Sequence, residues 1–196
     1  MRTGSGFSRV SSWFAPPYPG ALHAVIVVRN EVSLEQAFDR YHGAVFSFAY
    51  RLTRRADVAE DITQECFLAV LRAPGRFDPV RGSMRTFLFA IARNLALKHY
   101  RDQGGNPVDL DDVIPASDPR PALDVASAVE RAVALLPLLQ REALVLFQYE
   151  GATLEEIAQI VGADTGTVKS RLHRARERLR RELAPYRKVR GIHGTV

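Results

Sequence analysis

From Ser33 onward, apolar residues recur at every third or fourth position, which is the spacing that one face of an α-helix requires. Three such stretches fall between residues 33 and 101. Ser33 with Gln36 predicts a capping box for the first helix, and Asp57 with Glu60 marks the start of the second. The expected buried positions are Leu34, Phe38, Tyr41, Val45, Phe48 and Leu52 in the first, Val58, Ile62, Cys66 and Ala69 in the second, and Phe87, Leu88, Ile91 and Leu95 in the third.

A second group of helical stretches lies beyond a glycine- and proline-rich segment. Thr153 with Glu156 predicts a capping box for the short helix "LEEIAQIV". No segment after residue 30 alternates with the period of two that a strand requires. The expected buried positions are Val125, Val129, Val133 and Leu136 in the first helix of this group, and Val168, Leu172, Ala175, Leu179 and Leu183 in its last, with "LLQREALVLFQYE" forming a helix between them.

These patterns predict an all-α protein of two small helical domains joined by a flexible acidic linker. The expected boundaries are 1–32 for a disordered N-terminal extension, 33–101 for a three-helix unit, 102–123 for the linker, 124–184 for a helix-turn-helix unit and 185–196 for a basic tail.

Residues 10–28 carry no charged side chain, which raises the question of a membrane span or a signal peptide. Pro16, Pro17, Pro19 and Gly20 interrupt the run and leave only "AVIVV" as an apolar core. A membrane helix needs about 20 apolar residues, and this core is also weak for a signal peptide. We therefore expect no membrane insertion and a cytoplasmic location.

Basic and acidic residues are segregated along a chain whose formal net charge is +5. Ten Lys and Arg lie between residues 165 and 190 against only two Glu, whereas residues 102–124 hold six Asp and one Arg. A basic C-terminal region suggests a polyanionic partner. Cys66 is the only cysteine, which excludes an internal disulfide or a cysteine-rich zinc site, and we expect no metal and no cofactor.

The tripeptide Asp164-Thr165-Gly166 is the one that aspartic proteases use for catalysis. Such a site needs a second Asp that shares a proton with the first, and this chain has one copy, placed between two helical stretches. Chance is the favoured interpretation. The surrounding "TLEEIAQIVGADTGTVKSRLHRAR" instead predicts a helix-turn-helix, because a short capped helix, a glycine-containing turn and a longer helix follow one another.

In a helix-turn-helix, the first residues of the second helix contact base edges in the major groove. A solvated basic face is the simpler interpretation of an arginine-rich helix, but the capped helix and the turn favour DNA binding. Arg176, Arg178, Arg180 and Arg181 lie further along, where phosphates are in reach, and Gly166 and Thr167 can present backbone N–H groups. The side chains expected to project from the first two turns are Lys169, Ser170, Arg171, His173 and Arg174.

Taken together, these segments resemble the extracytoplasmic-function (ECF) sigma factors of bacterial RNA polymerase. The resemblance covers residues 34–184 and is carried by "AEDITQECFLAVLRAPGRFD" and "MRTFLFAIARNLALKHYR" for region 2, and by "LLPLLQREALVLFQYEGATLEEIAQIVGADTGTVKSRLHRARERLR" for region 4. It implies a non-enzymatic transcription initiation factor that binds core polymerase, recognises the minus-35 and minus-10 promoter elements and helps to melt the promoter.

The resemblance also implies roles for individual residues. At the minus-10 element, aromatic and cationic side chains would capture unstacked bases; Phe87 is also a candidate core residue, and the family often carries Trp at its position. The minus-35 residues are Gly166, Thr167, Lys169, Ser170, Arg171, His173, Arg174 and Arg178, and the minus-10 residues are Arg76, Phe77, Arg81, Arg85, Phe87, Asn94, Lys98 and Arg101. The polymerase-binding residues are Asp61, Gln64, Glu65 and Phe67.

The implied partners are core RNA polymerase, through the clamp coiled coil of its largest subunit and the flap of the second-largest, promoter DNA, and an anti-sigma factor. The acidic linker is either a mimic of a nucleic-acid strand or a plain spacer. The alternative function is a stand-alone helix-turn-helix regulator whose N-terminal unit senses a ligand or dimerises. An enzyme built on Asp164 or on a His–Cys pair has no support in the residue spacing.

Overall fold

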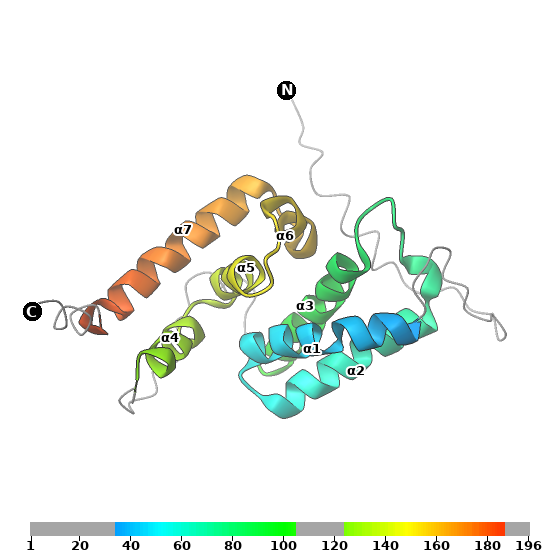
Figure 1. Cartoon of the computed structure of the whole chain (residues 1–196), viewed down its shortest axis with the longest axis horizontal. Coiled ribbons are helices and arrows are strands. Elements are labelled where there is room, and N and C mark those ends of the chain that lie inside the picture. The colour runs from blue at the N-terminus through cyan, green and yellow to red at the C-terminus, as the bar shows by residue number, and fades with distance from the viewer. Residues whose placement is uncertain (1–33, 105–123, 187–196) are drawn as a thin grey trace, which may run out of the picture.

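The computed structural model describes residues 34–104 and 124–186. In these two ranges all regular elements are helical, which confirms the all-α prediction. No helix in the same ranges is long and apolar enough to cross a bilayer. The elements are α1 (Leu34–Thr53), α2 (Ala56–Arg72), the 3₁₀ turn η2 (Pro74–Arg76), α3 (Met84–Asp102), α4 (Val125–Ala134), α5 (Leu138–Gln148), α6 (Leu154–Val161) and α7 (Thr165–Glu182) (Figure 1).

Helices α1, α2 and α3 pack against one another as a first bundle. Phe48 and Phe89 are enclosed in its core, where their rings meet edge to face with centroids 5.2 Å apart. Cys66 lies in the same core, and its thiol donates to the carbonyl of Leu88 at 3.3 Å. Burial raises the pKa of this thiol to about 12. Cys66 is therefore a small core residue and not a nucleophile.

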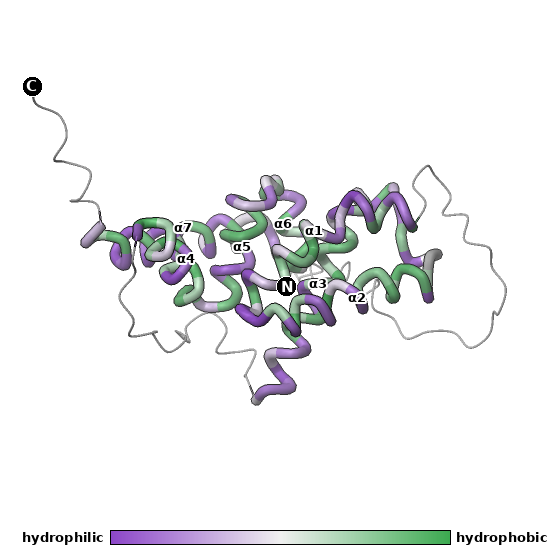
Figure 2. The backbone as a smooth tube through the Cα atoms, turned by 60° about the horizontal axis from the view of Figure 1, so that its bottom comes forward, coloured by the Kyte–Doolittle hydropathy of each residue, from purple (hydrophilic) through white to green (hydrophobic). Residues whose placement is uncertain are grey.

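Helices α4 to α7 form a second bundle with α5 at its centre (Figure 1). Every residue of α5 from Gln140 to Leu146 is buried, including three consecutive polar ones. Figure 2 shows hydrophobic and hydrophilic stretches alternating along the helices of both bundles. In α5, the apolar residues build the core, and the polar ones need partners among neighbouring helices.

The two bundles contact each other directly, because α6 packs on α3 and α5 packs on α1. Their buried apolar side chains form one connected core. Polar contacts also cross the junction: Arg141 Nη1 donates to the carbonyl of Leu52 at 2.9 Å, and the Gln159 amide donates to the carbonyl of Arg81. Helical periodicity predicts the bundles separately and carries no information about this junction.

Two residues expected in the core are exposed, and one helix begins a residue earlier than predicted. Phe38 is 44% exposed and Val125 is 54% exposed, although both were expected in the core. In α4, which packs on α7, Ala128 and Ala132 are buried instead. Helix α2 begins at Ala56, and Asp57 lies in its first turn, paired with Arg55. The predicted capping box of α1 begins at Ser33, which lies outside the described residues.

Candidate nucleic-acid interface

Helices α6 and α7 form the predicted helix-turn-helix, and hydrogen bonds define where α6 begins and ends. The capping box is confirmed: Thr153 Oγ1 accepts from the Glu156 N–H at 3.2 Å, and the Glu156 carboxylate accepts from the Thr153 N–H at 2.9 Å. Gly162 ends the helix with a φ of 67°, in the left-handed region that favours glycine. The chain therefore turns sharply after Val161, and α7 starts at Thr165 after three intervening residues.

Asp164 is the N-cap of α7. Its carboxylate accepts from the backbone N–H of Thr167 at 2.7 Å and from the Thr167 hydroxyl at 2.9 Å. The backbone hydrogen bond from Thr167 lowers the pKa of Asp164, so an anion stands at the positive end of the helix. A Cβ at Gly166 would lie 2.9 Å from Asp164 Oδ1. The Asp164-Thr165-Gly166 tripeptide thus serves as a helix cap.

One side of α7 is buried against α5 and α6. Val168, Leu172 and Ala175 are enclosed as predicted, whereas Leu179 and Leu183 are only half-buried. Lys169 and Arg174 are exposed, which the groove-binding prediction requires. The exposed residues of α7 on its other sides include Gly166, Lys169, His173, Arg174, Arg176, Arg180 and Arg181, while Thr167, Ser170 and Arg178 are half-buried.

Arg171 does not project outward with its neighbours. Its Nη1 lies 3.5 Å from Glu142 Oε1 on α5, and its side chain is only 13% exposed. This orientation differs from the outward one that the sequence predicted, because a fully buried carboxylate lies beside the border of the buried face of α7. In this structure, Arg171 therefore contacts α5 of the same protein through Glu142.

The residues predicted for the minus-10 element fall into two groups. Arg76, Arg81, Lys98 and Arg101 are exposed on η2, on the loop that follows it and on the second half of α3. Phe87 is 3% exposed, and the half-buried Phe77 packs on it with ring centroids 5.6 Å apart. Phe87 therefore belongs to the core, which was the second of the two roles that the sequence analysis left open for it.

Two more predicted minus-10 residues already have partners inside the protein. The Asn94 side-chain amide donates to the carbonyl of Ala90 at 2.8 Å. Arg85 stacks over the ring of Phe89 at 4.9 Å and donates to the carbonyl of Glu150 in the second bundle. Burial raises the pKa of Glu150 in spite of the nearby guanidinium. The second bundle thus contacts the start of α3 and the loop before it.

The residues predicted to bind polymerase lie along α2. Asp61 and Gln64 are exposed, and the half-buried Glu65 pairs with Arg72 at 2.7 Å. Phe67 is 6% exposed, and its ring meets Phe38 edge to face at 5.0 Å. The exposed aromatic ring on this surface is therefore Phe38, which the sequence analysis had assigned to the core.

Sequence reasoning missed the polar cluster formed by Arg93, Glu142 and Arg171, which we call the inner cluster. Arg93 on α3 donates two hydrogen bonds to Glu142, at 2.8 and 3.2 Å, and Arg171 approaches the same carboxylate from α7. A signal was available: three consecutive polar residues in a helix that is otherwise apolar all round span about 200°. At least one of residues 140–142 therefore had to face the interior.

Comparison with protein families assigns both bundles. The model of Sigma-70 region 2 matches residues 37–114, and that of Sigma-70 region 4 matches residues 126–179. Among curated proteins, the ECF RNA polymerase sigma factor SigM of Mycobacterium tuberculosis is 33% identical over 163 residues, covering 83% of each chain. The ECF RNA polymerase sigma factor SigE of Mycolicibacterium smegmatis is 34% identical over 190 residues, covering 90% of this chain and 73% of its own.

Solved structures give the same answer. The sigma factor RpoE from Bartonella quintana, in complex with the anti-sigma factor NepR, aligns with a TM-score of 0.62 at 30% identity. That alignment covers 76% of this chain and 96% of the other. CnrH in complex with the cytosolic domain of CnrY aligns with a TM-score of 0.60 at 25% identity, covering 78% and 88%. The chain belongs to the sigma-70 family and is an ECF RNA polymerase sigma factor.

Proposed function

We propose that this chain directs core RNA polymerase to promoters, with region 4 (residues 124–184) reading the minus-35 element and region 2 (residues 33–101) reading the minus-10 element. One observation carries the first part: the buried ridge of Val168, Leu172 and Ala175 fixes α7 so that Lys169, His173 and Arg174 stay exposed on its first turns. In a helix-turn-helix, these first turns of the second helix are the part that contacts base edges.

For the minus-10 element, η2, the following loop and α3 offer exposed cations, and the half-buried Phe77 offers an aromatic ring. Base–aromatic stacking contributes about 1–3 kcal/mol per base, which offsets part of the cost of unstacking the duplex. Because Arg85 donates to the carbonyl of Glu150 in the described arrangement, its contact with DNA requires the two bundles to separate. We therefore propose that promoter melting involves an opened form of the protein.

The polymerase contact is assigned to α2. Asp61, Gln64 and Glu65 offer acceptors for basic side chains of the clamp coiled coil, and Phe67 supports the neighbouring Phe38. Region 4 would contact the flap of the second-largest subunit. The structural relatives named above include a sigma factor bound to its anti-sigma factor, and we extend this mode of control to the present chain. The protein would act in the cytoplasm without catalytic activity of its own.

Reconstituted transcription tests the proposal. Core polymerase with the full-length chain should initiate at members of a promoter library that core polymerase alone ignores. The variant Asp61→Ala/Gln64→Ala should lose initiation and polymerase binding together, while Asp39→Ala on α1 serves as an exposed acidic control. Initiation from no member of the library would contradict the proposal. Tight, sequence-specific DNA binding without polymerase would favour the stand-alone regulator instead.

A further inference from the structure

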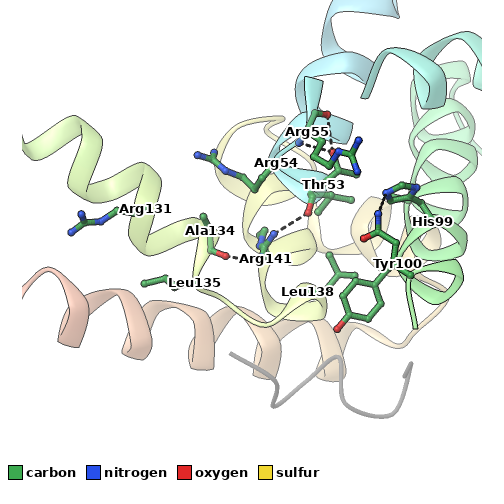
Figure 3. A pocket seen from close by; sticks show the side chains of 13 residues that line it. Thr53, Arg54, Arg55, His99, Tyr100, Arg131, Ala134, Leu135, Leu138 and Arg141 are labelled. Atoms are coloured by element: carbon green, nitrogen blue, oxygen red, sulfur yellow. Dashed lines mark hydrogen bonds between the residues drawn. The ribbon is translucent and has the colours of Figure 1, made fainter. Parts of the chain in front are cut away.

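A pocket of about 440 Å³ opens between the two bundles, where the ends of α1 and α3 meet α4 and α5 (Figure 3). Its volume falls in the range typical of small-molecule sites. No residue predicted to bind DNA or polymerase is part of the lining, although Lys98 and Arg101 flank the lining residues His99 and Tyr100 in the sequence. The lining consists of Leu52, Thr53, Arg54, Arg55, Ala96, His99, Tyr100 and Gln103 from the first bundle, and Arg131, Ala134, Leu135, Leu138 and Arg141 from the second.

Among the residues that the structure describes, four arginines line this pocket and no acidic residue does. Arg55 is neutralised by Asp57, and Arg54 lies 3.9 Å from Glu130, whose side chain is 64% exposed. Within residues 34–104 and 124–186, Arg131 and Arg141 form no ion pair with a carboxylate. The pocket therefore has an excess of positive charge.

Arg141 is the most buried charged residue of this wall, with 6% of it exposed. Its guanidinium donates to the carbonyls of Leu52 at 2.9 Å, Ala134 at 2.6 Å and Leu136 at 2.9 Å, and its Nε has no hydrogen-bond partner. Burial, together with the nearby charge of Arg54, lowers the pKa of Arg141 to about 10. The group stays cationic at neutral pH, and carbonyl partners do not cancel a buried charge.

We propose that this pocket binds a phosphate-bearing organic anion of nucleotide size. Guanidinium groups pair with phosphate oxygens through charge-assisted, often bidentate hydrogen bonds. Tyr100, Leu135 and Leu138 supply the aromatic and apolar surface that an organic body needs. Because both bundles contribute to the lining, an anion bound here stabilises the closed arrangement of the two bundles over an opened one. The site does not depend on the proposed promoter contacts.

Calorimetric titration of the full-length chain at physiological salt tests this site with three probes: inorganic pyrophosphate, ATP and citrate. Pyrophosphate and ATP should bind and raise the unfolding temperature, with ATP binding more tightly because of its organic body. Arg131→Gln and Arg54→Gln should each weaken ATP binding by about tenfold. Arg40→Gln is the matched control, since Arg40 is an exposed arginine on α1 that stacks on Tyr41 outside the pocket. Arg141 is left unchanged because its carbonyl contacts hold the fold together.

Three results would overturn the proposal. The first is that neither pyrophosphate nor ATP binds at millimolar concentration. The second is that Arg40→Gln weakens binding as much as the two pocket variants do, which would reveal only general attraction of anions to a basic protein. The third is that citrate binds as tightly as pyrophosphate, which would remove the phosphate assignment. Since none of these measurements involves polymerase or a promoter, failure here leaves the proposed transcriptional function untouched.

Discussion

Arg171 and Arg174 lie three residues apart on α7 and have opposite surroundings. Arg174 is exposed, whereas the side chain of Arg171 is drawn against the buried carboxylate of Glu142. A helix turns about 100° per residue, which places Arg171 about 60° and Arg174 about 120° from Val168 around the axis. Arg171 therefore stands at the border of the buried face, where a charge on the neighbouring helix decides its orientation.

The same contrast separates the inner cluster from an outer face, defined here as the cationic Lys169, Arg174 and Arg180 together with the neighbouring His173. The inner charges are withdrawn from water, so their pairing matters strongly to folding. The outer charges are screened by salt and contribute mainly when a polyanion binds. The number of arginines on a helix therefore does not give the number of its DNA contacts. Buried arginines stabilise the fold, and exposed arginines are available to a ligand.

The largest expected effect comes from removing the carboxylate of the inner cluster. Glu142→Gln leaves the guanidinium groups of Arg93 and Arg171 without a counter-charge in a nearly closed environment. Losing one member of a buried ion pair costs about 3–5 kcal/mol in the free energy of unfolding. Urea titration followed by circular dichroism measures this loss, with Glu60→Gln on the exposed side of α2 as the control.

A triple variant separates the loss of pairing from the loss of packing. Replacing the whole cluster by apolar side chains of similar size, as in Arg93→Met/Glu142→Leu/Arg171→Met, should recover most of the stability that Glu142→Gln loses, because such replacements are often neutral or stabilising. If Glu142→Gln costs less than about 1 kcal/mol, the cluster behaves like an exposed ion pair. The distinction between inner and outer charges would then fail.

The next effect concerns sequence recognition by the outer face. Arg174→Ala should cost about 1–3 kcal/mol at a matched minus-35 element and much less at a mismatched one, because a base-edge contact is lost only where the base is correct. Competition binding of the reconstituted holoenzyme to the two promoter forms measures the difference. An equal loss at both sites would contradict the groove assignment of Arg174.

Arg171 supplies the matched control on the same helix. Because its guanidinium faces Glu142, Arg171→Gln should lower the free energy of unfolding while leaving the ratio between matched and mismatched promoters unchanged. If Arg171→Gln instead reduces discrimination as strongly as Arg174→Ala does, then Arg171 leaves Glu142 to contact DNA. The comparison between the two arginines would then describe only the free protein.

The sequence was sufficient for features that depend on neighbours along the chain. Spacing predicted the buried ridge from Val168 to Ala175, and local hydrogen-bonding chemistry predicted the capping box of Thr153 and Glu156. Both follow from contacts within a few residues, where helix geometry fixes which groups meet. The same reasoning assigned Asp164 to a turn, and the structure adds that its carboxylate caps α7.

The features that sequence reasoning missed connect distant parts of the chain. Arg93 and Glu142 are 49 positions apart, and Arg85 and Glu150 are 65 apart. Periodicity reports which face of a helix is buried but not which helix covers it, so the packing of α6 on α3 could not be derived. Phe38 and Phe67 illustrate the same limit. Phe38 was expected in the core and is exposed, whereas Phe67 was expected at a binding surface and is buried, because the packing of α1 on α2 decides which ring is covered.

A smaller effect is expected at the N-cap of α7. The pKa of Asp164 is lowered in the folded protein, so its ionised carboxylate stabilises the fold above the ordinary pKa of an Asp, and this contribution is lost as the pH falls through the lowered value. The unfolding temperatures of wild type and Asp164→Ala should therefore differ at pH 7 and converge below about pH 4. Asp164→Asn, which keeps an acceptor without the charge, should fall between them at pH 7. If the difference in unfolding temperature stays constant with pH, the negative charge of Asp164 contributes nothing to stability, and the N-terminus of α7 is capped by hydrogen bonding alone.

The smallest effect is expected at Arg180, far along the outer face from the base-reading turns. Arg180 is exposed and pairs with Glu177 one turn away. We predict that its role with DNA is that of a phosphate contact. Arg180→Ala should weaken holoenzyme binding equally at matched and mismatched promoters and reduce the slope of log K against log salt by about one. Titrations at several salt concentrations measure that slope, with Arg40→Ala on α1 as the control. A change in discrimination with an unchanged slope would place Arg180 at base edges, and α7 would then enter the groove further along its length than the exposed first turns indicate.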